Sequence, residues 1–366
     1  MAAVSNSIVH LVMRFGDTVL SYGTGLLYER LGQFFIITAW HNVTGLHSET
    51  LRPLNKHLAI PDNIVASIVA VWPGMGSGRL PLTLPLADEE KALFYIHPVN
   101  WPRVDVVAIP FDPAAEHSLE GVLSNGEVMR EGIRLAAASG PAAEICPVQR
   151  YLVPDHVATA WINDVDVTEE LFIPGYPLNI QSHLAEPVWK RATVASSVQA
   201  GWNGERKFLI DSASQSGMSG APVVYYNAKG VVRIGGMTMH LDREAAILAG
   251  IYVGRMGVRN DRDPQIGTVW HASVIDEIID GRCHEHLAAE IELTNSALEA
   301  AVVESLRTCS REGLENLNNP QMRSRFYVQH EVLKRISGRA KPQRVLDAVV
   351  DMAQRYKGPL VPDEGV

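Results

Sequence analysis

The stretch DSASQSGMSGAPVVYY, residues 211–226, places a serine among glycines directly before an apolar, β-branched run. Ser219 is followed directly by Gly220, and Gly217 lies two positions before it. Glycine lacks a Cβ atom and permits a tight turn that exposes the serine hydroxyl. In such a turn the backbone N–H groups of Gly217 and Ser219 converge and can hold an oxyanion. The stretch therefore predicts an exposed serine directly before an apolar β-strand.

A second stretch, GTGLLYERLGQFFIITAWHNVTG at 23–45, contains the candidate base. It predicts a hairpin of two strands and places His41 where the second, apolar strand ends and enters a loop. A general base must be held rigidly and still reach substrate, and the end of a strand meets both needs. A lone histidine rarely has such a role, so this interpretation depends on its companions.

The third stretch, HPVNWPRVDVVAIPF at 97–111, supplies a carboxylate. Asp105 comes directly before the apolar run 106–109, and burial of an unpaired carboxylate is costly. A histidine N–H is a natural partner, because an aspartate can orient the imidazole and stabilise its protonated form. Together the three stretches predict a catalytic triad of His41, Asp105 and Ser219.

These motifs resemble those of a known enzyme family. TAWH at 38–41 is similar to a T-A-A-H motif, VDVVA at 104–108 to a D-[IV]-A motif, and GMSGAP at 217–222 to a G-x-S-G-G-P motif. All three belong to the trypsin-like serine peptidases of the chymotrypsin fold. The sparse cysteines are typical of the bacterial cytosolic and HtrA-like branch of that family.

Further similarities extend the resemblance over residues 7–280. They are the GTG of residues 23–25, the GYP of residues 175–177 and the GIYVG of residues 250–254. The resemblance implies two antiparallel, six-stranded β-barrels with the active site in the cleft between them. Short apolar, β-branched segments punctuated by Gly, Pro, Asn and Asp over residues 1–275 independently predict a mainly β fold.

The character of the sequence changes near residue 272. ASVIDEIIDG has apolar residues at helical spacing and ends in Gly281, and the following segments also have helical patterns. We therefore expect a protease domain at 1–282 and an α-helical C-terminal region at 283–366. These helices either complete the fold or form an interaction module that recruits a regulatory protein partner; the pattern does not decide between the two.

The resemblance also implies a set of substrate-binding residues in the cleft. They are Ala213, Ser214, Tyr252, Val253 and Gly254.

Two alignments of the specificity pocket remain open. One places Ala213 at the pocket base, with Gly254 and Gly267 leaving the pocket open for an uncharged, apolar side chain. The other places Asp211 at the base and favours Lys or Arg. Met218 stands where digestive relatives carry an aspartate that pairs with a new N-terminus, so we expect no activation of that kind.

The composition of the chain argues against some classes of binding partner and indicates a cellular compartment. The 366 residues carry a net charge of -9 and show no basic stripe, which argues against a nucleic-acid partner. Three cysteines do not form a disulfide framework, and we find no signal peptide or membrane span, so a cytoplasmic location without a membrane partner is expected. The spacing of the CHEH run at 283–286 is too tight for a standard zinc site. We expect neither metal nor cofactor.

The sequence thus predicts a serine endopeptidase that cleaves protein or peptide substrates through an acyl-enzyme. One alternative is a latent form of the same enzyme, activated when a partner engages the helical tail. The other is a catalytically idle relative that binds peptides in the same cleft.

Overall fold

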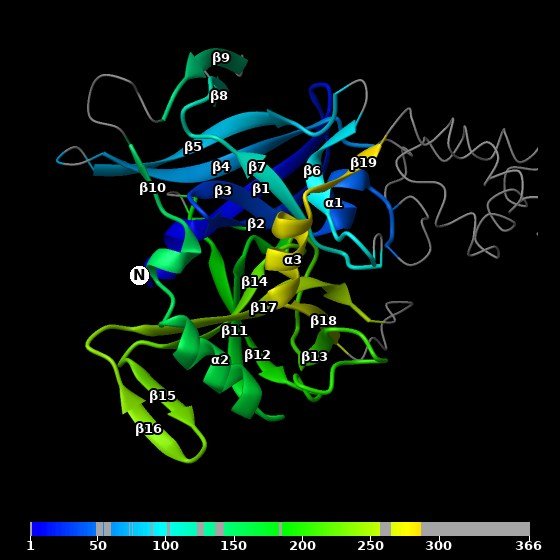
Figure 1. Cartoon of the computed structure of the whole chain (residues 1–366). Coiled ribbons are helices and arrows are strands. Elements are labelled where there is room, and N and C mark those ends of the chain that lie inside the picture. Colours follow the sequence, from blue (N-terminus) through cyan, green and yellow to red (C-terminus); the bar gives the residue numbers. More distant parts are fainter. Residues whose placement is uncertain are drawn as a thin grey trace, which may run out of the picture.

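The computed structural model describes residues 2–48, 54, 60–72, 74, 76–88, 91–100, 103–122, 128–135, 143–182, 185–256 and 265–286. The predicted helical region lies outside the described residues beyond position 286. Figure 1 shows two β units, with the blue and cyan strands of the first above the green and yellow strands of the second. Helix α3 (Ser273–Gly281) lies where the two units meet.

The first unit is an eleven-stranded sheet, called the N-terminal sheet below. Its strands pair in the order β19-β6-β7-β3-β2-β1-β4-β5-β8-β9, with β10 on β4, and these described pairings do not close a barrel. The strands are β1 (Ile8–Phe15), β2 (Thr18–Arg30), β3 (Gln33–Thr38), β4 (Asn63–Trp72), β5 (Gly76–Pro85), β6 (Lys91–Ile96), β7 (Val107–Phe111), β8 (His117–Val122), β9 (Val128–Ile133), β10 (Glu144–Ile145) and β19 (Cys283–His286).

This sheet differs from the six-stranded barrel expected for the first half. Strands β4 and β5 pair over ten positions each and carry the β8–β9 hairpin at their outer edge. At the opposite edge, Cys283–His286 pairs with β6, where the sequence predicted the start of the helical region. The extra strands enlarge the sheet at both edges.

The second unit is a closed, six-stranded antiparallel barrel, as predicted, with strand order β11-β12-β13-β18-β17-β14. It is called the C-terminal barrel below. Its strands are β11 (Glu170–Gly175), β12 (Val188–Val194), β13 (Lys207–Asp211), β14 (Pro222–Asn227), β17 (Ala245–Arg255) and β18 (Ile266–His271), and a separate hairpin joins β15 (Val231–Ile234) to β16 (Met237–His240).

Helical segments are few in the described part of the chain. They are the 3₁₀ turns η1 (Ala3–Ser7), η2 (Val148–Arg150) and η3 (Pro177–Asn179) and the α-helices α1 (Trp40–Thr44), α2 (Asp155–Asp164) and α3. Gly281 was expected just beyond the end of α3 but is its last residue; Arg282 adopts the left-handed conformation instead. A side chain at position 281 would meet the Pro98 ring, since an added Cβ would lie 2.9 Å from Pro98 Cγ.

A shared apolar core joins the two units. It contains Phe35 of the N-terminal sheet, Val224 of the barrel and Ile275 of α3, all buried. The Tyr28 hydroxyl donates to Asp276 Oδ1 at 2.9 Å, and Arg30 pairs with Asp276 as well. These contacts hold α3 against the sheet and keep the loops of both units in a constant relation to each other.

Candidate active site

His41 lies in the short helix α1, directly after β3. The sequence predicted a loop here; instead, extended Ala39 begins a single helical turn, and Gly45 ends it with φ of 69°. The Gly45 N–H donates to the His41 carbonyl oxygen at 2.9 Å. Neighbouring Trp40 is 1% exposed and anchors the turn in the core, so the backbone of His41 is firmly held while its ring reaches the surface.

Asp105 lies two residues before β7 and binds His41 twice. One carboxylate oxygen accepts from the His41 backbone N–H at 3.0 Å, and the other lies 2.8 Å from His41 Nδ1. An ionised carboxylate is an acceptor only, so Nδ1 must carry a proton. In the neutral imidazole the Nε2 lone pair is then available, which is the state that a general base needs.

The turn around Ser219 requires glycine at two positions. Gly217 and Gly220 have φ of 92° and 87°, a region that L-residues with side chains rarely adopt. A Cβ at Gly217 would lie 2.4 Å from the Tyr176 carbonyl oxygen, and one at Gly220 would lie 2.1 Å from that of Thr24. The glycines therefore permit both the turn and its close contact with neighbouring backbone.

The peptide group between Ser216 and Gly217 has a defined direction. The Ser216 carbonyl oxygen accepts a hydrogen bond from the Leu178 N–H at 2.6 Å. Since the carbonyl and N–H of a trans peptide point in opposite directions, the Gly217 N–H points away from Leu178. It donates to no protein atom in the described part of the chain.

The peptide group before Ser219 is arranged in the same way. The Met218 carbonyl oxygen accepts from the Ala221 N–H at 2.9 Å, and the Ser219 N–H, pointing the opposite way, has no acceptor among the described residues. The Met218 side chain is fully buried in the barrel core. The turn thus presents two N–H donors, those of Gly217 and Ser219, next to the serine hydroxyl.

Thr24 and Asn42 connect the turn to the N-terminal sheet. The Ser219 carbonyl oxygen accepts from the Thr24 N–H at 3.0 Å and from Asn42 Nδ2 at 2.9 Å. The Thr24 hydroxyl donates to the Gly217 carbonyl oxygen at 2.8 Å and accepts from the Tyr176 N–H at 3.1 Å. These bonds bring the serine turn against the helix that carries His41.

Sequence reasoning missed the roles of both residues. Thr24 was noted only as part of a glycine-flanked motif, and Asn42 only as the neighbour of His41. For Thr24 the available signal was a hydroxyl inside a predicted strand, because a buried hydroxyl needs partners. Asn42 was predicted in the loop after the strand, and its position carried no such signal. Both side chains are buried.

The Ser219 hydroxyl makes no hydrogen bond to the His41 ring in the described structure. Ser219 Oγ lies 3.5 Å from the Val253 carbonyl oxygen, longer than a normal O–H···O bond, and no hydrogen bond joins it to His41 within the described structure. Such contacts often tighten only when substrate binds. The structure therefore brings His41 and Asp105 together as a bonded pair, with Ser219 held against the same helix through Asn42.

The predicted substrate-binding residues lie in three different environments. Ala213 is exposed, and its carbonyl oxygen accepts from Lys190 Nζ. Ser214 and Tyr252 are buried, and their hydroxyls bond to each other. Val253 and Gly254 line an open cavity. Asp211, the alternative pocket base, is exposed at the end of β13.

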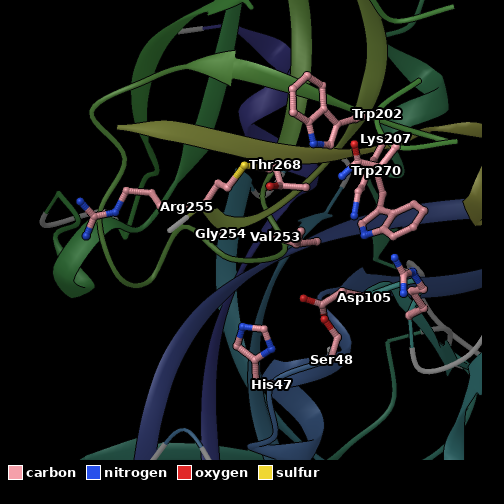
Figure 2. A pocket seen from close by; sticks show the side chains of 13 residues that line it. His47, Ser48, Asp105, Trp202, Lys207, Val253, Gly254, Arg255, Thr268 and Trp270 are labelled. Carbon is pink, nitrogen blue, oxygen red and sulfur yellow. The ribbon is translucent and has the colours of Figure 1, made fainter. Parts of the chain in front are cut away.

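The cavity has a volume of about 420 Å³ and lies beside Asp105. Figure 2 shows the indole rings of Trp202 and Trp270 along one side of it, with Lys207 between them. The Lys207 ammonium lies 2.6 Å from Glu205 Oε2 and over the Trp270 ring. Burial raises the pKa of Glu205, but Lys207 and Arg103 outweigh this effect and lower it overall, so the carboxylate stays ionised.

The described residues form neither a metal centre nor a membrane-spanning helix. No group of three or more His, Cys, Asp or Glu side chains there is arranged to hold a metal ion. Among the helices described, none has both the length and the apolar character needed to cross a membrane.

The chain resembles several proteins of known structure in its fold. No protein-family model and no curated protein matches it. An inactive serine mutant of Rv3671c from M. tuberculosis H37Rv is 13% identical, with a TM-score of 0.34, over 77% of this chain and 88% of that one. A serine endoprotease from Yersinia pestis is 11% identical, with a TM-score of 0.36, over 76% and 65% of the two chains.

A mutant of the HtrA-type protease AlgW with a bound tripeptide is 13% identical. Its TM-score is 0.36, and the match covers 76% of this chain and 62% of that one. At such low similarity, the chemistry of the site itself has to support any assignment of function.

Proposed function

We propose that this chain is a serine endopeptidase in which His41, Asp105 and Ser219 form the catalytic triad. The observation that carries the proposal is the 2.8 Å contact between His41 Nδ1 and Asp105 Oδ2, made next to a serine that lies on a glycine-flanked turn. A base oriented by a carboxylate, a nucleophile and two free N–H donors are the groups that acyl transfer needs.

Acylation begins when Ser219 Oγ attacks the carbonyl carbon of the scissile peptide bond. His41 Nε2 takes the hydroxyl proton, and Asp105 stabilises the imidazolium that forms. The carbonyl oxygen becomes an oxyanion and accepts hydrogen bonds from the Gly217 and Ser219 N–H groups. The C–N bond then breaks, and His41 returns the proton to the leaving amine.

Deacylation follows the same steps as acylation, with water as the nucleophile. His41 Nε2 takes a proton from water while the oxygen attacks the acyl carbon. The ester bond to Ser219 breaks, its oxygen recovers the proton from His41, and the carboxylic acid product leaves. One oxyanion donor is typically worth about 2.7–4 kcal/mol in such transition states.

The arrangement of the serine turn supports an enzyme whose oxyanion site is assembled before substrate arrives. The Ser216 and Met218 carbonyl oxygens are both taken by backbone donors, so neither occupies the position of the oxyanion. This favours an active protease over the latent alternative. The missing contact between Ser219 and His41 is the feature that favours the idle, peptide-binding alternative.

The test is labelling of the purified chain with a small fluorophosphonate, read as intact mass. We expect one adduct on the wild type and none on Ser219→Ala, with labelling of His41→Ala slowed by at least about 10³-fold. Ser216→Ala is the matched control, because this exposed serine lies in the same turn and should leave labelling unchanged.

Circular dichroism establishes that each variant is folded. A folded wild-type chain without an adduct would contradict the proposal and support the peptide-binding alternative. An adduct that persists in Ser219→Ala would assign the reactive serine elsewhere.

A further inference from the structure

The position of the substrate residue before the scissile bond follows from the proposed chemistry, on which this inference rests. Its carbonyl carbon must approach Ser219 Oγ while the carbonyl oxygen meets the Gly217 and Ser219 N–H groups. The resemblance to trypsin-like peptidases implies that its side chain lies between the segment that contains Ala213 and Ser214 and strand β17.

Backbone hydrogen bonds hold Tyr252 of β17 against the serine turn. The Gly220 N–H donates to the Tyr252 carbonyl oxygen at 2.8 Å, and the Tyr252 N–H donates to the Ala221 carbonyl oxygen at 2.8 Å. The next residue, Val253, contacts Ser219 Oγ through its carbonyl oxygen at 3.5 Å. The backbone of Tyr252 therefore cannot shift without disturbing the serine turn.

The Tyr252 side chain is buried in the core of the C-terminal barrel. It is 2% exposed, and its ring lies over Gly267, where an added Cβ would be 2.6 Å from Tyr252 Cε2. Its hydroxyl bonds to the side chain of Ser214, which is completely buried. The space that Gly267 leaves, which the sequence suggested for a substrate side chain, is thus occupied by the protein itself.

The Tyr252 side chain is held at its backbone by the serine turn and at its hydroxyl by Ser214. The phenolic hydroxyl has a buried partner, so moving the ring into solvent would leave Ser214 without a bond. Gly254, by contrast, has nothing within 4 Å of an added Cβ and faces the open cavity. Room for large substrate side chains therefore exists beyond Gly254 but not beside Tyr252.

We infer that Tyr252 determines specificity by filling the pocket next to Ser219, and that the chain accepts only a small residue, Gly, Ala or Ser, before the scissile bond. The size of this pocket sets which residue a serine protease of this mechanism accepts. Longer side chains, including Leu, Phe and Lys, would have to displace the ring and break its bond to Ser214. The exposed Asp211 offers no charged pocket base for Lys or Arg.

The test uses equilibrium capture of hexapeptides of mixed sequence by the folded Ser219→Ala chain, with mass spectrometry of the bound peptides. Cleavage products end in the residue that occupies the pocket. We expect Gly, Ala and Ser to be enriched at least tenfold over Leu, Phe and Lys at the last position. Adding Tyr252→Val should shift enrichment to Leu and Phe, because the ring is removed.

Tyr252→Phe is the matched control, since it keeps the ring and loses only the hydroxyl; the preference for small residues should persist. Equal or greater capture of peptides ending in Leu, Phe or Lys by the chain with Tyr252, or capture without preference, would overturn the inference. If Tyr252→Val does not fold, Tyr252→Leu replaces it, and the preference of the chain with Tyr252 still decides.

Fluorophosphonate labelling of the wild type separates this inference from the proposed function. Enrichment of small residues without an adduct supports the pocket and contradicts the enzyme. An adduct without enrichment supports the enzyme and contradicts the pocket.

Discussion

The N-terminal sheet and the C-terminal barrel contribute to the site in different ways. The sheet supplies His41 and Asp105, and their positions depend on direct hydrogen bonds between the two residues. The barrel supplies Ser219, whose position depends on backbone conformation at Gly217 and Gly220. The proposed base, His41, is thus oriented by a polar side chain, whereas the proposed nucleophile, Ser219, is positioned by backbone conformations that only glycine adopts readily.

The N-terminal sheet and the C-terminal barrel also differ in whether their strands form a closed ring. The barrel pairs its six strands in a complete ring, whereas the described pairings of the N-terminal sheet leave edge strands, namely β19, β9 and the short β10. A closed ring has no free edges, so its strands hold one another in register. The sheet must instead gain its position relative to Ser219 from contacts across the interface, made by Thr24, Asn42 and the shared core.

Among the substitutions that test this comparison, Gly220→Ala should lower the stability of the protein most. The added Cβ would lie 2.1 Å from the Thr24 carbonyl oxygen and 2.3 Å from the Thr38 hydroxyl, and φ is 87°. The free energy of unfolding should fall by about 2–5 kcal/mol, from the left-handed conformation and the overpacking together. Denaturant titration followed by circular dichroism measures it.

Gly16→Ala is the control for that substitution. Gly16 also has positive φ, 56°, but nothing lies within 4 Å of an added Cβ. Gly16→Ala should therefore lower the free energy of unfolding by only about 1–2 kcal/mol. Equal losses for the two variants would show that the interface between sheet and barrel does not constrain the serine turn.

Thr24→Val should have an intermediate effect. Valine has the same shape but leaves the Gly217 carbonyl oxygen and the Tyr176 N–H without their hydroxyl partner. We expect a loss of about 1–3 kcal/mol in the free energy of unfolding and slower fluorophosphonate labelling, because the turn is less firmly held.

Thr24→Ser keeps the hydroxyl and should retain the labelling rate. If Thr24→Val labels as fast as the wild type, the bond to Gly217 does not position the oxyanion donors.

The smallest effect on stability is expected at His10, which joins β1 to the last residue of η3. Its Nε2 lies 2.7 Å from Asn179 Oδ1, and the rings of Tyr22 and Tyr176 flank it. Burial lowers its pKa, the Asn179 contact opposes this, and the Arg79 charge lowers it further. Because the folded pKa lies below about 6.5, the unfolded chain binds more protons between these two values, and stability decreases as pH falls through this window.

One such group contributes a slope of at most about 1.4 kcal/mol per pH unit. His10→Gln should flatten the dependence of the free energy of unfolding on pH just below 6.5. His271, whose pKa is also lowered, by burial and by Arg206, should preserve part of the slope. An unchanged curve in His10→Gln would show that His10 is not a source of the pH dependence.

Local patterns in the sequence were sufficient to predict many of the strands. The apolar, β-branched runs AILAGIYVG (246–254) and FFIIT (34–38) are strands in the structure, because their pattern fits a pleated sheet whatever their partners. The closed second barrel was predicted too. The eleven-stranded sheet was not, because the pairing of β5 with β8 and of β19 with β6 joins residues far apart in sequence.

The candidate site shows the same limit at the level of single residues. The order and spacing of His41, Asp105 and Ser219 were visible, and so was the need for glycines around the serine. The helical rather than loop conformation at His41 was not, since it depends on Trp40 being buried beneath the turn. The burial of Ser214 and Tyr252 was not predicted either, and their roles in substrate binding stay predictions.

Local patterns predicted the mainly β character of the protein and the residues proposed for chemistry, because these depend on spacing along the chain and on glycine's freedom of backbone rotation. The closed barrel was expected from the resemblance to trypsin-like peptidases and not from spacing. Only the tertiary structure decided that Thr24 and Asn42 hold the serine turn and that Tyr252 occupies the space over Gly267. The direction in which a buried side chain points depends on strand register and on bulges, such as the one between Tyr252 and Gly254. Register results from contacts between distant strands, and no local stretch of sequence contains it.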